Sequence, residues 1–289
     1  MPPFVQAALL GVVQGLTEFL PVSSSAHLIL ARMFFGFDER KFGLAFDVAI
    51  HIGTLVAVII YFRRDLEALV RSLPQLFSPG RAASGQHVSI ERQDVRVGAE
   101  GARLIWLIVI GTIPAVIVGL FWGDTIETSL RTAQVAAAML TLGAIGFLVA
   151  ERAGGQLRNE ESLTAAEAMI IGCAQAAALV PGVSRSGATI TIALFLGLRR
   201  AEAARYTFLL GIPAILGAAV LKFPDMLDQG VGPDGAALFV IGIISSAVVG
   251  YLAVKYFVRF LAKHSLDVFA WYRLGLAALT VVWVAVAAS

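Results

Sequence analysis

Six long apolar segments constrain the fold of this chain more than any other feature. Each is about as long as the roughly 20 residues that an α-helix needs to cross ~30 Å of hydrocarbon. They are residues 43–62, 104–122, 132–150, 206–222, 236–257 and 268–287. Hydrophobic residues make up 58% of the 289 positions and charged residues only 15%, which excludes an ordinary soluble domain. The sequence therefore predicts an all-α polytopic membrane protein with six transmembrane helices, in a single domain over residues 1–289.

Two further apolar regions are each interrupted by a proline. They are residues 4–35, broken at Pro21, and residues 165–198, broken at Pro181. The residue before a proline is biased away from the helical conformation, so each region is expected to form two half-helices. Broken helices at membrane depth occur where the backbone is buried in protein or lines a cavity. We therefore expect two re-entrant helical hairpins; the alternative at each place is one kinked spanning helix.

The two interrupted regions resemble each other at a constant offset of 161 residues. The matched pairs are Gly11 with Gly172, Gln14 with Gln175, Val22 with Val183, Ser23 with Ser184, and Ser25 with Ser186. A fixed offset indicates an internal repeat. The chain is thus predicted to consist of two halves, residues 1–150 and 151–289, each beginning with a hairpin.

The distribution of basic residues predicts the orientation in the membrane. Residues 63–103 hold seven arginines, and short loops rich in Lys and Arg face the cytoplasm. This cytoplasmic loop is expected to be irregular or to form an amphipathic surface helix. The orientation puts 15 of the 22 basic residues inside, both termini outside, and the hairpins into opposite faces. Such an inverted-topology repeat brings broken helices together near the midplane at a substrate site.

Gln14 and Glu18 are the first candidate site residues. They lie four residues apart and so share one side of the first half-helix. Their oxygens are suited to a hard divalent cation, Mg²⁺ or Ca²⁺, whose other ligands are waters and phosphate oxygens. The alternative is a neutral, hydrogen-bonded glutamic acid without a metal.

A run of hydroxyls and a histidine follow Pro21. Ser23, Ser24 and Ser25 stand where the second half-helix begins, so one of them is expected to cap it. A helix N-terminus also attracts anions, and His27 in the first turn is placed to exchange protons or to attack phosphorus. Capping alone for the serines, and packing for the histidine, are the alternatives.

Arg185 is the only charged residue between Glu167 and Arg199. Its burial at this depth costs roughly 2.5 to 3.5 kcal/mol, which an anion would offset. That anion is either Glu18 or a phosphate held by the guanidinium. The residues expected around such a phosphate are Ser184, Ser186, Gly187 and Thr189.

Other features exclude some functions. A net charge of +2 is too small to indicate nucleic-acid binding, and the single Cys173 has no disulfide partner. Asp47 and His51 form another pair four residues apart. They line the mouth of the cavity or are wet interfacial residues, and we expect no catalysis from them.

The segments "QGLTEFLPVSSSAH" and "PGVSRSGATI", followed by "GIPA", resemble the signature regions of the undecaprenyl-diphosphatase family of the bacitracin-resistance type. The resemblance extends along essentially the whole chain and implies the same six-helix, two-hairpin fold. It implies removal of the terminal phosphate from undecaprenyl diphosphate at the outer face of the bacterial plasma membrane. The product is recycled as the carrier for cell-wall precursors, which counters bacitracin.

The resemblance assigns roles to residues of both motifs. It implies metal ligation by Gln14 and Glu18, an essential serine at Ser24, a functional His27 and phosphate binding by Arg185. Gln14 is a departure, because many members carry glutamate there. Ser24, His27 and water all remain candidates for the nucleophile. The implied partners are a polyprenyl diphosphate lipid and the surrounding membrane lipids, and a homodimer is left open.

Two rival functions remain. The first is a secondary transporter or prenyl-phosphate flippase, because inverted repeats are transporter architecture; transport without phosphate release would distinguish it. The second is the lipid phosphatase family with PSGH and SRxxxxxH elements. The stretch "SRSGATITIALFL" lacks the histidine that the second element requires, which argues against it.

Overall fold

The structure, a computed structural model, describes residues 1–77, 87–90, 93–228 and 233–287, most of them helical. Six helices are long and apolar enough to cross a membrane, which confirms the prediction of a multi-pass membrane protein. They are α4 (Leu44–Tyr61), α6 (Ala99–Ser129), α7 (Ala133–Ala153), α10 (Arg200–Asp228), α11 (Pro233–Leu261) and α12 (Asp267–Ala287). Each contains all or nearly all of a predicted span.

The remaining described elements are shorter. They are the helices α1 (Pro3–Phe19), α2 (Ser24–Phe35), α3 (Glu39–Phe42), α5 (Arg63–Ser72), α8 (Ala165–Ala177) and α9 (Arg185–Phe195), the 3₁₀ helices η1 (Leu73–Phe77) and η2 (Glu160–Ser162), and the strands β1 (His87–Ile90) and β2 (Gln93–Arg96). The two strands pair antiparallel, with His87 opposite Arg96.

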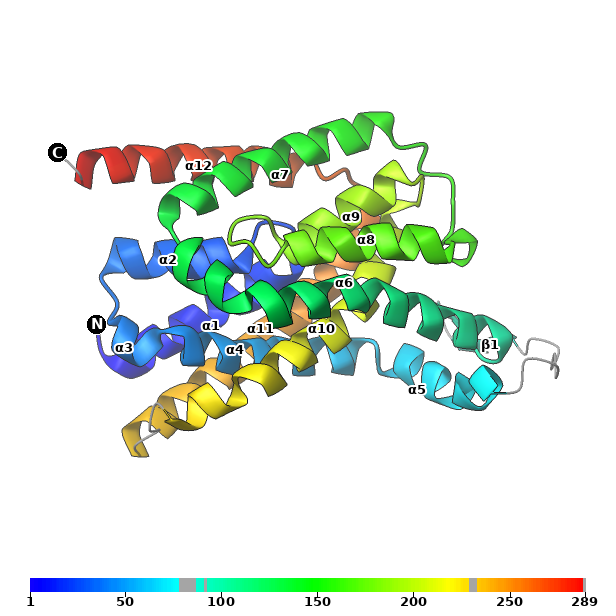
Figure 1. Cartoon of the computed structure of the whole chain (residues 1–289), viewed down its shortest axis with the longest axis horizontal. Coiled ribbons are helices and arrows are strands. Elements are labelled where there is room, and N and C mark those ends of the chain that lie inside the picture. Colours follow the sequence, from blue (N-terminus) through cyan, green and yellow to red (C-terminus); the bar gives the residue numbers. More distant parts are fainter. Residues whose placement is uncertain (78–86, 91–92, 229–232, 288–289) are drawn as a thin grey trace.

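Helices α1 and α2 form one hairpin, and α8 and α9 form the other. Figure 1 shows that the two hairpins open toward opposite ends of the molecule and that their turns meet in its middle. Both chain termini lie at one end, and α5 and β1 lie at the other (Figure 1). The breaks fall at the two predicted prolines. That the hairpins re-enter a membrane, and from which faces, stays a prediction.

Each hairpin packs its first helix against a long helix of the opposite half. Helix α1 packs on α11, and α8 packs on α6. A Cβ atom on Gly11 would come closer than 3.0 Å to the carbonyl oxygen of Gly242, and one on Gly172 equally close to that of Gly111. Glycine thus lets the backbones approach closely at both crossings. These two glycines are one of the pairs related by the offset of 161.

The segment 63–103 contains more regular structure than a loop. Of the two interpretations, the amphipathic helix describes Arg63–Ser72, which is α5. Its inner face buries Asp65, Ala68 and Ser72, and the Ser72 hydroxyl accepts a hydrogen bond from the Gly98 N–H at 3.1 Å. Residues 78–86 and 91–92 lie outside the described residues. Helix α6 begins at residue 99, before the predicted span.

Candidate active site

The two hairpin turns share one unusual conformation. Ser23 and Ser184, the residues just before α2 and α9, have φ angles of 74° and 73°, which are rare for residues other than glycine. Each hydroxyl caps its helix, accepting from Ala26 N–H at 3.4 Å and from Gly187 N–H at 3.1 Å. The first turn therefore uses Ser23 as the expected cap, and the repeat reproduces it in the second turn.

Glu18 lies at the centre of the predicted site. Its carboxylate is buried and accepts a hydrogen bond from the Ser24 hydroxyl at 2.7 Å and from the Gln14 amide at 3.1 Å. The spacing of four residues predicted that Gln14 and Glu18 share one side of α1, and the structure confirms it. The carboxylate oxygen Oε2 is thus in place to receive the proton of Ser24.

Arg185 joins this group from the other hairpin. Its Nη2 lies 2.9 Å from Glu18 Oε1. Its Nη1 is buried and has no hydrogen-bond partner among the residues that the structure describes. The guanidinium therefore binds Glu18, as one interpretation expected, while its second terminal nitrogen packs against Gly211 of α10 without a hydrogen-bond partner among the described residues.

Two further hydroxyls of the motifs, those of Ser25 and Ser186, join the turns to each other. Ser25 accepts a hydrogen bond from the Gly182 N–H at 3.4 Å, and Ser186 donates to the Glu18 carbonyl oxygen at 3.3 Å. Thr189 donates to the Arg185 carbonyl oxygen at 2.7 Å. The Ser184 hydroxyl and the Gly187 N–H form the hydrogen bond that caps α9. In this state these residues position the turns, and their contact with a substrate stays a prediction.

His27 has both ring nitrogens engaged. Nδ1 lies 2.7 Å from the Ser23 carbonyl oxygen, and Nε2 lies 2.7 Å from the Tyr272 hydroxyl. A carbonyl oxygen only accepts, so in the neutral ring Nδ1 carries the proton and Nε2 accepts the proton of Tyr272. The rings are also stacked, with centroids 5.6 Å apart.

Two residues of α12 are additions that the motifs did not predict. One is Tyr272, the partner of His27. The other is Arg273, which is fully buried and donates to the carbonyl oxygens of Pro21 at 3.2 Å and of Gly182 at 2.9 Å. It thereby ties both turns together. Arg273 is the only charge inside the last apolar segment, 268–287, and the cost of burying a charge there is the sequence signal that could have found it.

Asp47 and His51 have separate surroundings. The Asp47 carboxylate is buried and pairs with Arg32 and Arg131, so the interpretation of a wet interfacial residue is wrong for it. His51 Nε2 lies 3.5 Å from Glu18 Oε2, which places this half-buried histidine beside the predicted site.

The architecture and these motifs coincide with a known family. The family described as bacitracin resistance protein BacA matches residues 7–279. The chain belongs to the BacA family.

Curated relatives of this BacA-family chain cover nearly its full length. An undecaprenyl-diphosphatase of Rubrobacter xylanophilus is 48% identical over 96% of the chain and 97% of the relative. Proteins of the same description from Alcanivorax borkumensis and Desulforudis audaxviator are 44% and 43% identical, over 97% and 99% of the chain, and each alignment covers 98% of the relative.

The residues of the BacA motifs fit a divalent cation in one respect. Gln14 Oε1 is buried and has no hydrogen-bond partner among the described residues, while Nε2 of the same amide donates to Glu18 Oε2 at 3.1 Å. The described parts of the chain contain no group of three or more His, Cys, Asp or Glu side chains that would hold a metal ion. A cation here would draw its other ligands from a substrate and water, as Mg²⁺ commonly does.

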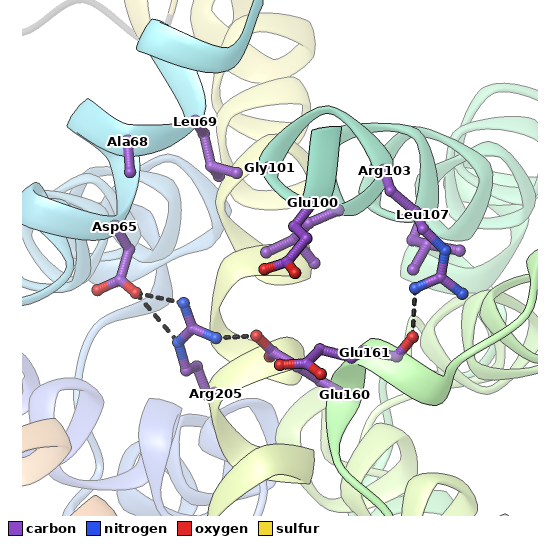
Figure 2. A pocket seen from close by; sticks show the side chains of 11 residues that line it. Asp65, Ala68, Leu69, Glu100, Gly101, Arg103, Leu107, Glu160, Glu161 and Arg205 are labelled. Atoms are coloured by element: carbon purple, nitrogen blue, oxygen red, sulfur yellow. Dashed lines mark hydrogen bonds and ion pairs between the residues drawn. The ribbon is translucent and has the colours of Figure 1, made fainter. Parts of the chain in front are cut away.

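A second polar cluster surrounds a cavity of about 280 Å³ at the end of the molecule that carries α5 (Figure 2). Arg205 pairs with Asp65 at 2.6 Å and with Glu160, and Arg103 donates to the carbonyl oxygen of Glu161. The described lining comes from α5, α6, η2 and α10, and the hairpins contribute nothing to it. The ion pairs of this cluster hold α5 and η2 to α10.

Proposed function

We propose that this protein hydrolyses undecaprenyl diphosphate to undecaprenyl phosphate and inorganic phosphate. The observation that carries the proposal is the junction of the two hairpins, where the Ser24 hydroxyl lies 2.7 Å from the Glu18 carboxylate and Arg185 keeps one buried donor without a partner among the described residues. The names of the curated relatives identify the substrate.

Binding of the diphosphate rests on positive charge at the junction. Arg185 Nη1 donates to an oxygen of the terminal phosphate, and the N-termini of α2 and α9 direct their positive ends to the same place. Ser23, Ser25, Ser184, Ser186, Gly187 and Thr189 shape this anion site. The prenyl tail lies in the lipid phase, where apolar burial supplies affinity at about 25 cal/mol per Å².

Ser24 is the nucleophile in this mechanism. Its oxygen attacks the terminal phosphorus while its proton passes to Glu18 Oε2, and the bond between that phosphorus and the bridging oxygen breaks. Undecaprenyl phosphate leaves, and water then hydrolyses the phosphoserine to release inorganic phosphate and restore the hydroxyl. A serine needs an adjacent base, and Glu18 is bonded directly to it.

His27 is less suited to attack phosphorus. In the neutral ring, Nδ1 bears the proton donated to Ser23, and the lone pair of Nε2 is used by Tyr272. A nucleophilic or basic His27 would first have to release the tyrosine. We therefore assign His27 and Tyr272 to positioning the first turn of α2.

A divalent cation, Mg²⁺ or Ca²⁺, would be held by Gln14 Oε1 and Glu18 and would neutralise charge on the phosphate oxygens. Phosphoryl transfer depends mainly on positioning and charge stabilisation. An amide supplies an oxygen without a charge, so Gln14 makes this site weaker than one with two carboxylates. Removal of the cation with EDTA is expected to suppress phosphate release, and addition of either ion to restore it.

The orientation proposed is that of a bacterial plasma-membrane enzyme whose site and both termini face outward. Most basic residues then lie in the cytoplasm, as their effect on orientation requires. The product returns to peptidoglycan synthesis as the lipid carrier, and consumption of the diphosphate deprives bacitracin of its target. A homodimer is compatible with this scheme, and no step depends on one.

The test is phosphate release from undecaprenyl diphosphate by the purified protein in detergent, followed by mass spectrometry of parallel samples quenched in acid, which preserves phosphoserine, and in alkali, which preserves phosphohistidine. Ser24→Ala is expected to lower the rate at least about 10³-fold, whereas Ser245→Ala, in α11, serves as a matched control. A phosphoserine at Ser24 supports the mechanism. A phosphohistidine at His27, or no covalent intermediate, would refute the assignment of the nucleophile.

The transport alternative makes a different prediction from the same preparation. A flippase without phosphatase activity would move prenyl phosphate across vesicles and release no phosphate. Well-folded protein that releases none with Mg²⁺ or Ca²⁺ would overturn the proposed function.

A further inference from the structure

The outer face of α5 forms a groove of about 370 Å³ that the proposed reaction does not use. Its lining residues are Ile59, Arg63, Leu66, Glu67, Val70 and Arg71. Ile59 belongs to the end of α4, and the other residues belong to α5. The groove therefore begins on a spanning helix and continues along the helix that follows it.

The groove lies at the edge of the membrane. Only Phe62 separates α4 from α5, and the last turn of α4 exposes Ile59 and Ile60. A spanning helix ends where the hydrocarbon ends, so α5 starts in the headgroup region. Val70 on the same face is 62% exposed, which is typical of a helix whose apolar side lies in the lipid interface.

The charges at this groove are complementary to a phosphate. Arg63 and Arg71 are exposed and stand two helical turns apart, with Glu67 between them. Neither guanidinium has a hydrogen bond or ion pair to any residue in the described ranges. By contrast Asp65, on the inner face, is held by Arg205 at 2.6 Å. The inner face thus fixes the helix and leaves the outer arginines available.

We propose that this groove binds one anionic phospholipid of the phosphatidylglycerol class. The phosphate lies between Arg63 and Arg71, the glycerol hydroxyls donate to Glu67, and an acyl chain follows Leu66 and Val70 to Ile59. Two arginines against one glutamate give the rim a net charge of +1, which favours a lipid with net negative charge over a zwitterionic one. The bound lipid fixes the junction of α4 and α5 at the membrane surface.

Native mass spectrometry of the delipidated full-length protein tests this proposal, with phosphatidylglycerol or phosphatidylcholine of equal chain length added. Wild type is expected to retain phosphatidylglycerol preferentially. Each arginine near a charged lipid surface contributes about fivefold in affinity, so Arg63→Gln with Arg71→Gln should lower phosphatidylglycerol affinity roughly 25-fold. Arg64→Gln, an exposed arginine of the same helix outside the groove, is the matched control and should change it little.

A second variant keeps the test informative if the double variant folds poorly. Glu67→Gln raises the charge of the rim, so it should increase phosphatidylglycerol affinity, which a folding defect would not do. Equal retention of both lipids by wild type, or a preference that survives in the double variant, would overturn the proposal. Loss of the preference in Arg64→Gln alone would show a diffuse surface charge and would also overturn it.

Discussion

At the scale of single residues, two arginines of the hairpin junction occupy space that glycines provide. A Cβ on Gly211 would overlap the Arg185 guanidinium, and one on Gly143 would overlap that of Arg273. Gly211 begins the "GIPA" segment, which belongs to the family resemblance but to which the sequence assigned no role. The position of Arg185 therefore depends on the absence of a side chain at Gly211 of α10 as well as on the ion pair of Arg185 with Glu18.

Gly211→Ala is expected to displace Arg185 and lower the rate of phosphate release about 100-fold, the usual effect of losing one donor to a developing anion. The measurement is the steady-state rate at saturating substrate, together with the melting temperature. Gly217→Ala in the same helix is the control, because nothing lies within 4 Å of a Cβ there. Equal rates for the two variants would contradict this account of Gly211.

Only part of this residue-level geometry could be predicted from the sequence. The contact of Gln14 with Glu18 follows from helical spacing, and a partner for Arg185 follows from the cost of an unpaired charge in the membrane. Tyr272 lies 245 residues from His27, and no local rule joins them. The packing of α12 against α7 brings Tyr272 and Arg273 to the turns, and that packing is a property of the tertiary fold.

At the scale of elements, the hairpin breaks and the six spans were predicted because proline and continuous apolar length act locally. Helix α5 was predicted only as one alternative. The residues that pair with its inner face lie far away in the sequence, so local pattern does not reveal them. Arg205 of α10 lies between the buried carboxylates of Asp65 and Glu160 (Figure 2). A helix as short as α5 is marginally stable alone. The ion pairs of this cluster therefore supply tertiary stabilisation.

Arg205→Gln is expected to destabilise the protein by about 3 to 5 kcal/mol, because it leaves two buried carboxylates without their counter-charge. The melting temperature in detergent should fall clearly, and protease cleavage near α5 should appear at lower temperature. Arg199→Gln, six residues earlier, just before α10 and exposed, is the control. A melting temperature for Arg205→Gln that matches the control would mean that the carboxylates find other partners or become protonated at little cost.

At the scale of the whole molecule, the internal repeat relates the two halves of the structure. The offset of 161 residues links the two caps, the two glycine crossings and the two hairpins, and Figure 1 shows these hairpins pointing in opposite directions. A single membrane orientation then makes the halves inverted copies. In the orientation that we propose, the arginine-rich end with α5 faces the cytoplasm, where anionic lipid attracts basic segments.

Cysteine labelling in intact cells tests this orientation. In a Cys173→Ser background, Thr125→Cys near the end of α6 should react with a membrane-impermeant maleimide, because this end shares the side of the chain termini. Gly155→Cys, in the exposed connection after α7, should react only after the cells are opened. The reverse pattern would place the arginines outside and refute the outward-facing site. Labelling of both positions in intact cells would show two orientations in one population. The asymmetry of 15 basic residues against five on the other side, which leaves out Arg185 and Arg273 at the hairpin junction, should prevent this.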